Sequence, residues 1–124
     1  MKQKQLNVLG TLIEICGTSP KTGYYRDGCC HTESNDFGMH TVCAVVTKEF
    51  LEYSRRQGND LITPRPELNF PGLQPGDAWC VCATRFEEAR LAGCAPMVKL
   101  TATNEKTLEI VSLEVLKTYQ IDLN

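Results

Sequence analysis

The sequence has no apolar run long enough to cross a membrane. Its longest apolar runs, Val42–Val46 and Ala78–Ala83, are far shorter than the roughly 20 residues that a membrane-spanning helix requires. The chain starts with basic residues, but Asn7 and Glu14 then interrupt any apolar core of a secretory signal. We therefore expect a cytoplasmic protein that does not contact a membrane and whose thiols are mostly reduced.

Clustered positive charge is also lacking. The chain has 13 Lys and Arg against 15 Asp and Glu, a net charge of −2, and its only adjacent basic pair is Arg55-Arg56. A nucleic-acid surface requires a basic stripe or patch, so nucleic acid is not an expected partner. There is likewise no phosphate-binding glycine loop, nucleophile elbow or HExxH motif. An unknown small molecule or a protein is left as the expected partner.

The order of the expected elements predicts an α+β fold in a single globular domain spanning residues 1–124. We expect a mixed or antiparallel sheet with two to three short helices and long ordered loops. The expected strands are Leu6–Ile15, which includes a turn, His40–Val46, Ala78–Ala83, Met97–Ala102 and Leu108–Val111. The expected helices run from a Thr47 cap to Gln57, from a Thr84–Glu87 capping box to Gly93, and from a Ser112 cap.

Two long irregular segments are expected to carry function. Gly17–Met39 exceeds the roughly 12–15 residues of ordinary loops, and its aromatic and cysteine residues favour burial over disorder. Asp27-Gly28 within it suits a tight hairpin turn. Thr63–Asp77 contains four prolines and should be stiff. We expect the segments Tyr24–His40 and Asp60–Asp77 to form a shared pocket near the cysteines.

Cysteine is abundant, with seven residues, an odd number that fits a closed set of disulfides poorly. Side chains alternate across a strand, so Cys80 and Cys82 should share a face. If the strand of Cys43 lies beside theirs, the three thiols meet, and the loop can bring further cysteines to them. Such a cluster could hold zinc, although the spacing differs from the usual Cys-x2-Cys knuckle. We expect no cofactor, with zinc possible; the metal candidates are Cys29, Cys30, Cys43, Cys80 and Cys82, with His31 or His40 as alternates.

Two other uses of these cysteines stay open. Free cysteine commonly behaves as a small buried hydrophobe, which suits Cys43, Cys80 and Cys82 among their apolar neighbours. Alternatively, Cys29 or Cys30 in the loop is a redox or nucleophilic thiol with His40 as its base; a disulfide between these adjacent cysteines is a further option. Cys16 and Cys94 are interpreted as incidental.

Charged residues in loops or at element ends are candidates for ligand binding. Short acidic side chains there often bond their own backbone, so turn or capping roles are the alternative for them, and for Asp36 as well. Arg65 and Glu67 could contact a ligand or pair with each other. His40 could equally be a hydrogen-bonded structural residue. The ligand-binding candidates are Asp27, Asp60, Arg65, Glu67 and Asp77.

Several motifs in combination resemble an uncharacterised bacterial family, domain of unknown function 2237. They are YYRDGCCHT, HTVCA, GNDL, TPRPE, FPGLQPGDAWCVCA and the tail TNEKTLEIVSLEVLK. The resemblance covers about residues 7–116 and implies a small stand-alone α+β protein, but no activity. Asn104 stands where the family usually has a histidine, and Phe86 where it usually has a tryptophan. Asn104 therefore argues against a mechanism that needs the tail histidine.

Three functions are compatible with these features, and whether the protein is an enzyme is left open. The first is a ligand- or partner-binding domain with a loop pocket near the cysteine cluster. The second is a thiol-dependent enzyme or redox protein that uses Cys29 or Cys30 with His40. The third is a structural zinc domain.

Overall fold

The computed structural model describes residues 5–122, so residues 1–4, which include the basic start of the chain, and residues 123–124 lie outside the described part. The strands are β1 (Val42–Val45), β2 (Ala78–Val81) and β3 (Met97–Val98). The α-helices are α1 (Lys48–Arg56), α2 (Ala83–Leu91) and α3 (Leu113–Thr118). Short 3-10 helices are η1 (Pro66–Leu68), η2 (Leu100–Ala102) and η3 (Glu105–Glu109). The predicted α+β class is confirmed.

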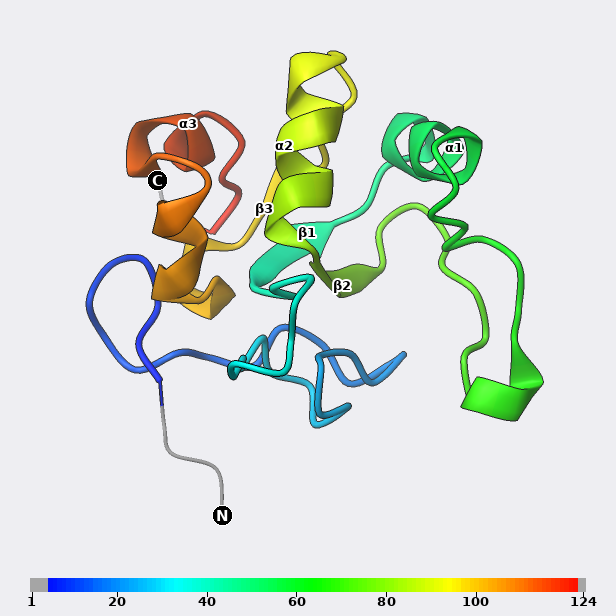
Figure 1. Ribbon diagram of the computed structural model, residues 1–124, viewed down its shortest axis with the longest axis horizontal. Coiled ribbons are helices and arrows are strands. Elements are labelled where there is room, and N and C mark those ends of the chain that lie inside the picture. The colour runs from blue at the N-terminus through cyan, green and yellow to red at the C-terminus, as the bar shows by residue number, and fades with distance from the viewer. Residues whose placement is uncertain (1–4, 123–124) are drawn as a thin grey trace.

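The sheet is antiparallel, with the strand order β2-β1-β3. Cys43 of β1 lies opposite Cys80 of β2, as expected if the two strands are neighbours. Figure 1 shows the three α-helices gathered on one side of the sheet, while the chain before β1 runs along the other side. Each face of the sheet is therefore covered by a different kind of structure.

The helix side carries the main hydrophobic core. Phe50 of α1, Phe86 of α2 and Leu116 of α3 are completely buried, and they belong to one cluster with Val42 and Ala44 of β1. Because side chains alternate along a strand, these β1 residues face the helices while Cys43, between them, faces the other way.

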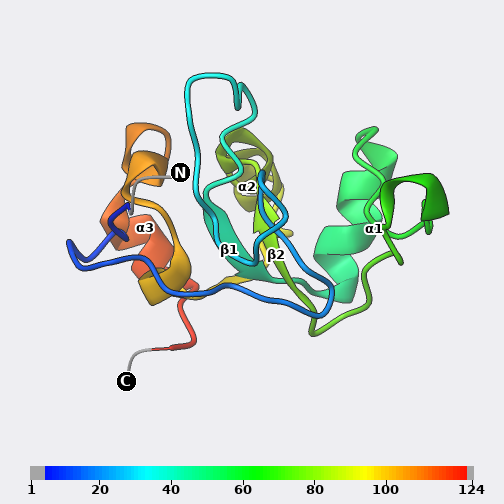
Figure 2. The same cartoon turned by 90° about the horizontal axis from the view of Figure 1, so that it is seen from below.

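The opposite side carries a second, smaller core made largely of cysteine. Cys16, Cys30, Cys43 and Cys80 form it together with Ala102. The segment before β1 that covers this core makes few regular elements, and Figure 2 shows it looping across the sheet. Residues 5–41 are therefore attached to the sheet by disulfides and by hydrogen bonds such as that of the Cys80 N–H to the Thr22 hydroxyl, without a strand or an α-helix of their own.

Helix capping followed the sequence at two of the three predicted positions. The side chains of Thr47 and Ser112 accept hydrogen bonds from the first turns of α1 and α3. The predicted capping box at Thr84 is wrong: α2 begins at Ala83, and its N-cap is Cys82, whose side chain makes no capping bond. Glu87 instead pairs with Arg90 one turn later.

Two predicted strands are also wrong, and a third, Met97–Ala102, is a strand only at Met97–Val98 and ends in the 3-10 helix η2. Residues 108–111 lie at the end of η3 rather than in a strand, because Asn104 caps a 3-10 turn there. Residues 6–15 form only isolated bridges, Leu6 with Leu12 and Asn7 with Asn104. No paired strands flank Asp27-Gly28 either. Among residues 5–122, no helix is long and apolar enough to cross a membrane.

Candidate functional site

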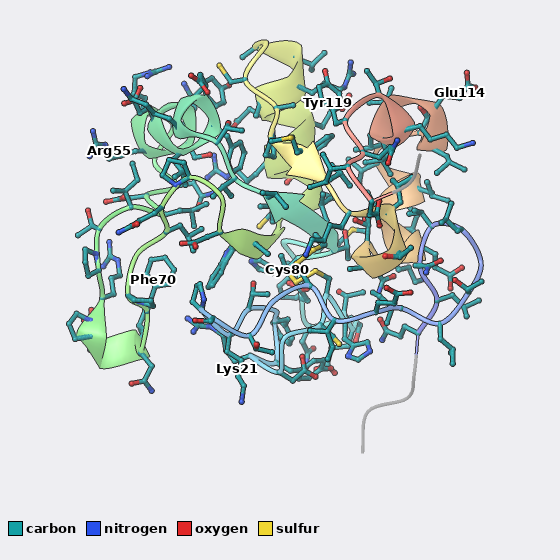
Figure 3. The ribbon with its side chains drawn as sticks, turned by 180° about the vertical axis from the view of Figure 1, so that it is seen from behind. Lys21, Arg55, Phe70, Cys80, Glu114 and Tyr119 are labelled. Carbon is teal, nitrogen blue, oxygen red and sulfur yellow. A yellow bond between two sulfur atoms is a disulfide. The ribbon has the colours of Figure 1, made fainter. Side chains whose placement is uncertain are left out.

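Four cysteines form two disulfides, Cys16–Cys43 and Cys30–Cys80. All four are at most 3% exposed. In Figure 3 the sulfurs beside Cys80 lie between the sheet and the segment that precedes β1. The bonds therefore fix that segment to β1 and β2.

This pairing changes several sequence-based expectations. Cys16 is not incidental, since it bonds Cys43. Cys30 is a buried half of a disulfide and in this state offers no nucleophilic thiol. It pairs with Cys80 rather than with its neighbour Cys29. The expectation of mostly reduced thiols differs from the structure for four of the seven cysteines. The cytoplasmic location stays a prediction.

Cys82 lies outside the buried disulfide layer, at the end of β2 and the start of α2. It is partly exposed. Its position as the N-cap places it beside the first turn of α2, which has no side-chain cap. The Ala83 N–H donates to the carbonyl of Met39 at 3.0 Å, so the N–H groups of Thr84 and Arg85 are the ones without a partner inside the helix or a side-chain cap. The positive end of the helix dipole favours negative charge at this point.

Asp36 holds His40 in a fixed orientation. Asp36 Oδ1 lies 2.6 Å from His40 Nδ1, and Asp36 Oδ2 accepts the backbone N–H of His40 at 2.9 Å. The hydroxyl of Thr32 donates to the same oxygen at 3.0 Å. The carboxylate is almost completely buried, whereas the ring of His40 is partly exposed. With Nδ1 committed to Asp36, Nε2 is the nitrogen that can act on another group.

That other group is Cys82. Cys82 Sγ and His40 Nε2 both lie close to Gly38: a Cβ atom placed on Gly38 would be 3.0 Å from the sulfur and 3.6 Å from the nitrogen. Because glycine has no Cβ, the sulfur and the nitrogen can share this small space. A hydrogen bond with Cys82 is the largest cause that raises the pKa of His40 to about 9, with further contributions from the charges of Cys82 and Asp36. His40 is therefore a cation at neutral pH, adjacent to sulfur.

The profile of an uncharacterised protein family conserved in bacteria, DUF2237, matches residues 6–120. The chain belongs to this family. No curated protein matches it. DUF2237 membership carries no assigned activity.

The structure of this DUF2237 protein gives the departures from the family pattern structural roles. Asn104 is buried, accepts the N–H of Lys106 as the cap of η3, and donates to the carbonyl of Cys30. Phe86 packs in the main core against Tyr119. The backbone N–H of Phe86 also donates to the carbonyl of Cys82 at 2.9 Å, in the first turn of α2.

The five candidate ligand-binding residues lie in turns and caps. Asp60 accepts bonds from Ile62 and Thr63, which hold the pKa of its carboxyl below the usual value. The remaining four occupy similar positions: Asp77 accepts from Gln74, Asp27 accepts from Cys29, Arg65 precedes η1, and exposed Glu67 lies within it. Their role in ligand binding stays a prediction.

Two pockets adjoin the two long loops, and the expected shared pocket between these loops stays a prediction. One pocket of about 640 Å³ is lined by segments 32–39 and 104–109, with Gln5 and Leu6. A second, of about 520 Å³, is lined by segments 18–21 and 64–71. Neither pocket combines residues 24–40 with residues 60–77, and none of the five candidates lines either one.

The buried cysteines also have the geometry of a metal site. The sulfur atoms of Cys16, Cys30 and Cys80 lie within 4.8 Å of one another, so this buried triad could hold a metal. Cys43 is bonded to one member of the triad, whereas the candidate ligands Cys29 and Cys82 are not among its members. Metal binding there would require thiolates and therefore open disulfides.

Sequence reasoning included His40 but not its two partners. Cys82 was interpreted as a metal candidate or a buried core thiol, because its helix was expected to start two residues later. Asp36 was interpreted as a turn residue. The available signal was the i, i+4 spacing of Asp36 and His40 in a glycine-containing loop just before β1.

Proposed function

We propose that this protein is a thiol-dependent enzyme in which Cys82 is the nucleophile, His40 transfers the proton and Asp36 positions His40. The observation that carries the proposal is that Cys82 Sγ and the His40 ring lie beside the same point at Gly38, while the other side of that ring contacts the buried carboxylate of Asp36. A nucleophile beside a base that a third group orients is the general pattern of covalent catalysis. This assignment replaces Cys29 and Cys30 with Cys82.

Acyl transfer is the reaction class that fits these groups. The Cys82 thiolate attacks the carbonyl carbon of an acyl donor, and the oxygen gains negative charge near the N–H groups of Thr84 and Arg85, which no side chain caps. As the intermediate collapses, the bond to the leaving group breaks and His40 gives that group its proton. Water or another acceptor then attacks the thioester, loses a proton to His40 and restores the Cys82 thiolate.

Exposure of the site bears on the substrate class. The side chain of His40 is 38% exposed, and neither pocket is lined by Cys82 or His40. An acyl group presented on an extended small molecule or on a protein segment fits such a surface better than an enclosed metabolite does. The net charge of −2 supports neither nucleic acid nor an anionic membrane as partner.

The test uses p-nitrophenyl acetate as a general acyl donor. The wild type and Cys94→Ser should release one equivalent of nitrophenol rapidly and carry one acetyl group on Cys82, located by peptide mass mapping. Cys82→Ser and His40→Asn should lose this burst. Cys94→Ser is the matched control, because Cys94 is, like Cys82, a partly exposed cysteine outside the disulfides. Acetylation spread equally over Cys82 and Cys94 would overturn the proposal.

A ligand-binding function is a second candidate, because one pocket does lie near the cysteine cluster. Asn104, in the wall of the pocket of about 640 Å³, donates to the carbonyl of Cys30. The pocket also contains Asp36, so a bound ligand would adjoin the residue that positions His40. If the protein binds a ligand without reacting with it, the ligand should still raise the thermal stability of Cys82→Ser. It should no longer raise the thermal stability of Phe37→Asp, because Phe37 lies in the pocket wall.

Structural zinc is a third candidate, favoured by the buried triad of Cys16, Cys30 and Cys80. It predicts that protein purified under reductant retains one zinc, that chelation loosens the fold, and that thiols react only after chelation. Protein whose reduced form stays folded without zinc would contradict it.

A further inference from the structure

The loop before β1 brings three different metal-binding side chains together. One oxygen of Asp27, the sulfur of Cys29 and one ring nitrogen of His31 all lie within 4.8 Å of one another. The residues alternate along the chain, and Gly28 between the first two has a φ of +91°, a backbone conformation that disfavours any other residue. All three side chains are partly buried.

Hydrogen bonding already orients the carboxylate within this group. Asp27 Oδ1 accepts the backbone N–H of Cys29 at 3.1 Å, and Asp27 Oδ2 lies 3.5 Å from His31 Nδ1. A Cβ on Gly23 would lie 2.2 Å from the carbonyl of Cys29 and 3.5 Å from Asp27 Oδ1. The loop therefore closes tightly around the three ligand atoms and holds them in place before any ion binds.

His31 supplies an independent sign of a missing ligand. Its Nδ1 atom is buried and makes no hydrogen bond within residues 5–122. Buried polar atoms are nearly always satisfied, and an exception commonly marks a water or an ion. An ion bound between Asp27, Cys29 and His31 would satisfy this nitrogen with a coordinate bond.

We infer that Asp27, Cys29 and His31 form a zinc-binding site that is separate from the disulfide layer. One thiolate, one neutral imidazole and one carboxylate are all normal zinc ligands, and three protein ligands leave the fourth tetrahedral position for water. Cys30, the next residue, is fully buried in its bond to Cys80, so zinc can bind Cys29 while that disulfide stays closed. Binding forms a Zn–S bond and releases the Cys29 thiol proton to the solvent.

The test titrates zinc sulfate into full-length protein purified without reductant, which keeps both disulfides closed. Native mass spectrometry and calorimetry should find one zinc per chain in the wild type, with a proton released. Cys29→Ser and His31→Asn should each lose stoichiometric binding. Cys94→Ser and Cys82→Ser should retain it, because neither residue belongs to the group.

The variants must also be shown to fold, since a folding defect would mimic the loss of a ligand. Far-ultraviolet circular dichroism and the Cys82 reactivity of Cys29→Ser and His31→Asn provide this control. The inference is overturned if the wild type takes up no zinc, or if folded Cys29→Ser and His31→Asn both retain it. Neither outcome depends on acyl transfer at Cys82.

Discussion

Asp36 Oδ1 lies 2.6 Å from Nδ1 of His40, and the two residues are four apart in the same loop. The carboxylate side chain is 1% exposed, and it also accepts from Thr32 and from the His40 backbone. A buried acid with all these partners fixes the orientation of the His40 ring. The free edge of the ring is thereby turned toward Cys82.

His40 should titrate far above an ordinary histidine. Its pKa is expected at about 9 because of the hydrogen bond and charge of Cys82 and the contact with Asp36. In Cys82→Ala it should fall toward 6.5. The chain has only two histidines, so ring-proton NMR can follow both, with His31 as the internal reference.

The raised pKa of His40 should make the stability of the fold depend on pH. Because the folded-state pKa is raised, protonated His40 stabilises the fold fully below about pH 6.5, and this contribution is lost as pH rises toward 9. Urea unfolding should show that decline in the wild type and a shallower one in His40→Asn. Equal slopes would contradict the raised pKa.

Asp36→Asn should weaken the hold of residue 36 on the His40 ring. The amide keeps the shape of the carboxylate but has no negative charge. The protonated form of His40 is therefore less stabilised, and its ring is held less firmly in one orientation. We expect a stability loss of about 1–3 kcal/mol and a lower His40 pKa. Asp60→Asn, which alters another hydrogen-bonded carboxylate, is the matched control and should leave His40 unchanged.

Gly38→Ala should impair the site more than the fold. The added Cβ would lie 3.0 Å from Cys82 Sγ and 3.2 Å from His40 Cε1, which forces the two side chains to shift. Gly58→Ala is the converse control: it has open space but a φ of +89°, so it should cost about 1 kcal/mol of stability and spare Cys82 reactivity. A fully reactive Gly38→Ala protein would argue that the small space is unimportant.

Breaking a disulfide should release the functional loop. Cys16→Ala with Cys43→Ala opens a link across 27 residues and should cost about 3–4 kcal/mol, measured by urea unfolding. The loop that carries Asp36 should then lose its hydrogen-exchange protection first. Cys94→Ala, outside both disulfides, should have little effect on either measurement.

The sequence was sufficient to locate β1 and β2, because β-branched and apolar runs of strand length mark buried strands. It predicted the meeting of Cys43 with Cys80 only on the condition that the two strands are neighbours, which the register of the sheet meets. The caps at Thr47 and Ser112 were equally readable. The partner of Cys16 was not, since it lies in an irregular segment whose path depends on tertiary contacts. The site itself was hidden by a shift of two residues: a helix capped by Cys82 instead of Thr84, and therefore starting at Ala83 instead of Arg85, turns Cys82 from a strand residue into an N-cap.

Competitive alkylation of native protein tests the central claim, an activated thiol at Cys82, most directly. Wild-type protein is treated with limiting iodoacetamide at pH 6.5, and Cys82 and Cys94 are compared by peptide mass mapping. We predict that Cys82 reacts at least about tenfold faster, and that His40→Asn brings it to the rate of Cys94. Equal rates in the wild type, or a Cys82 rate unchanged by His40→Asn, would contradict the account.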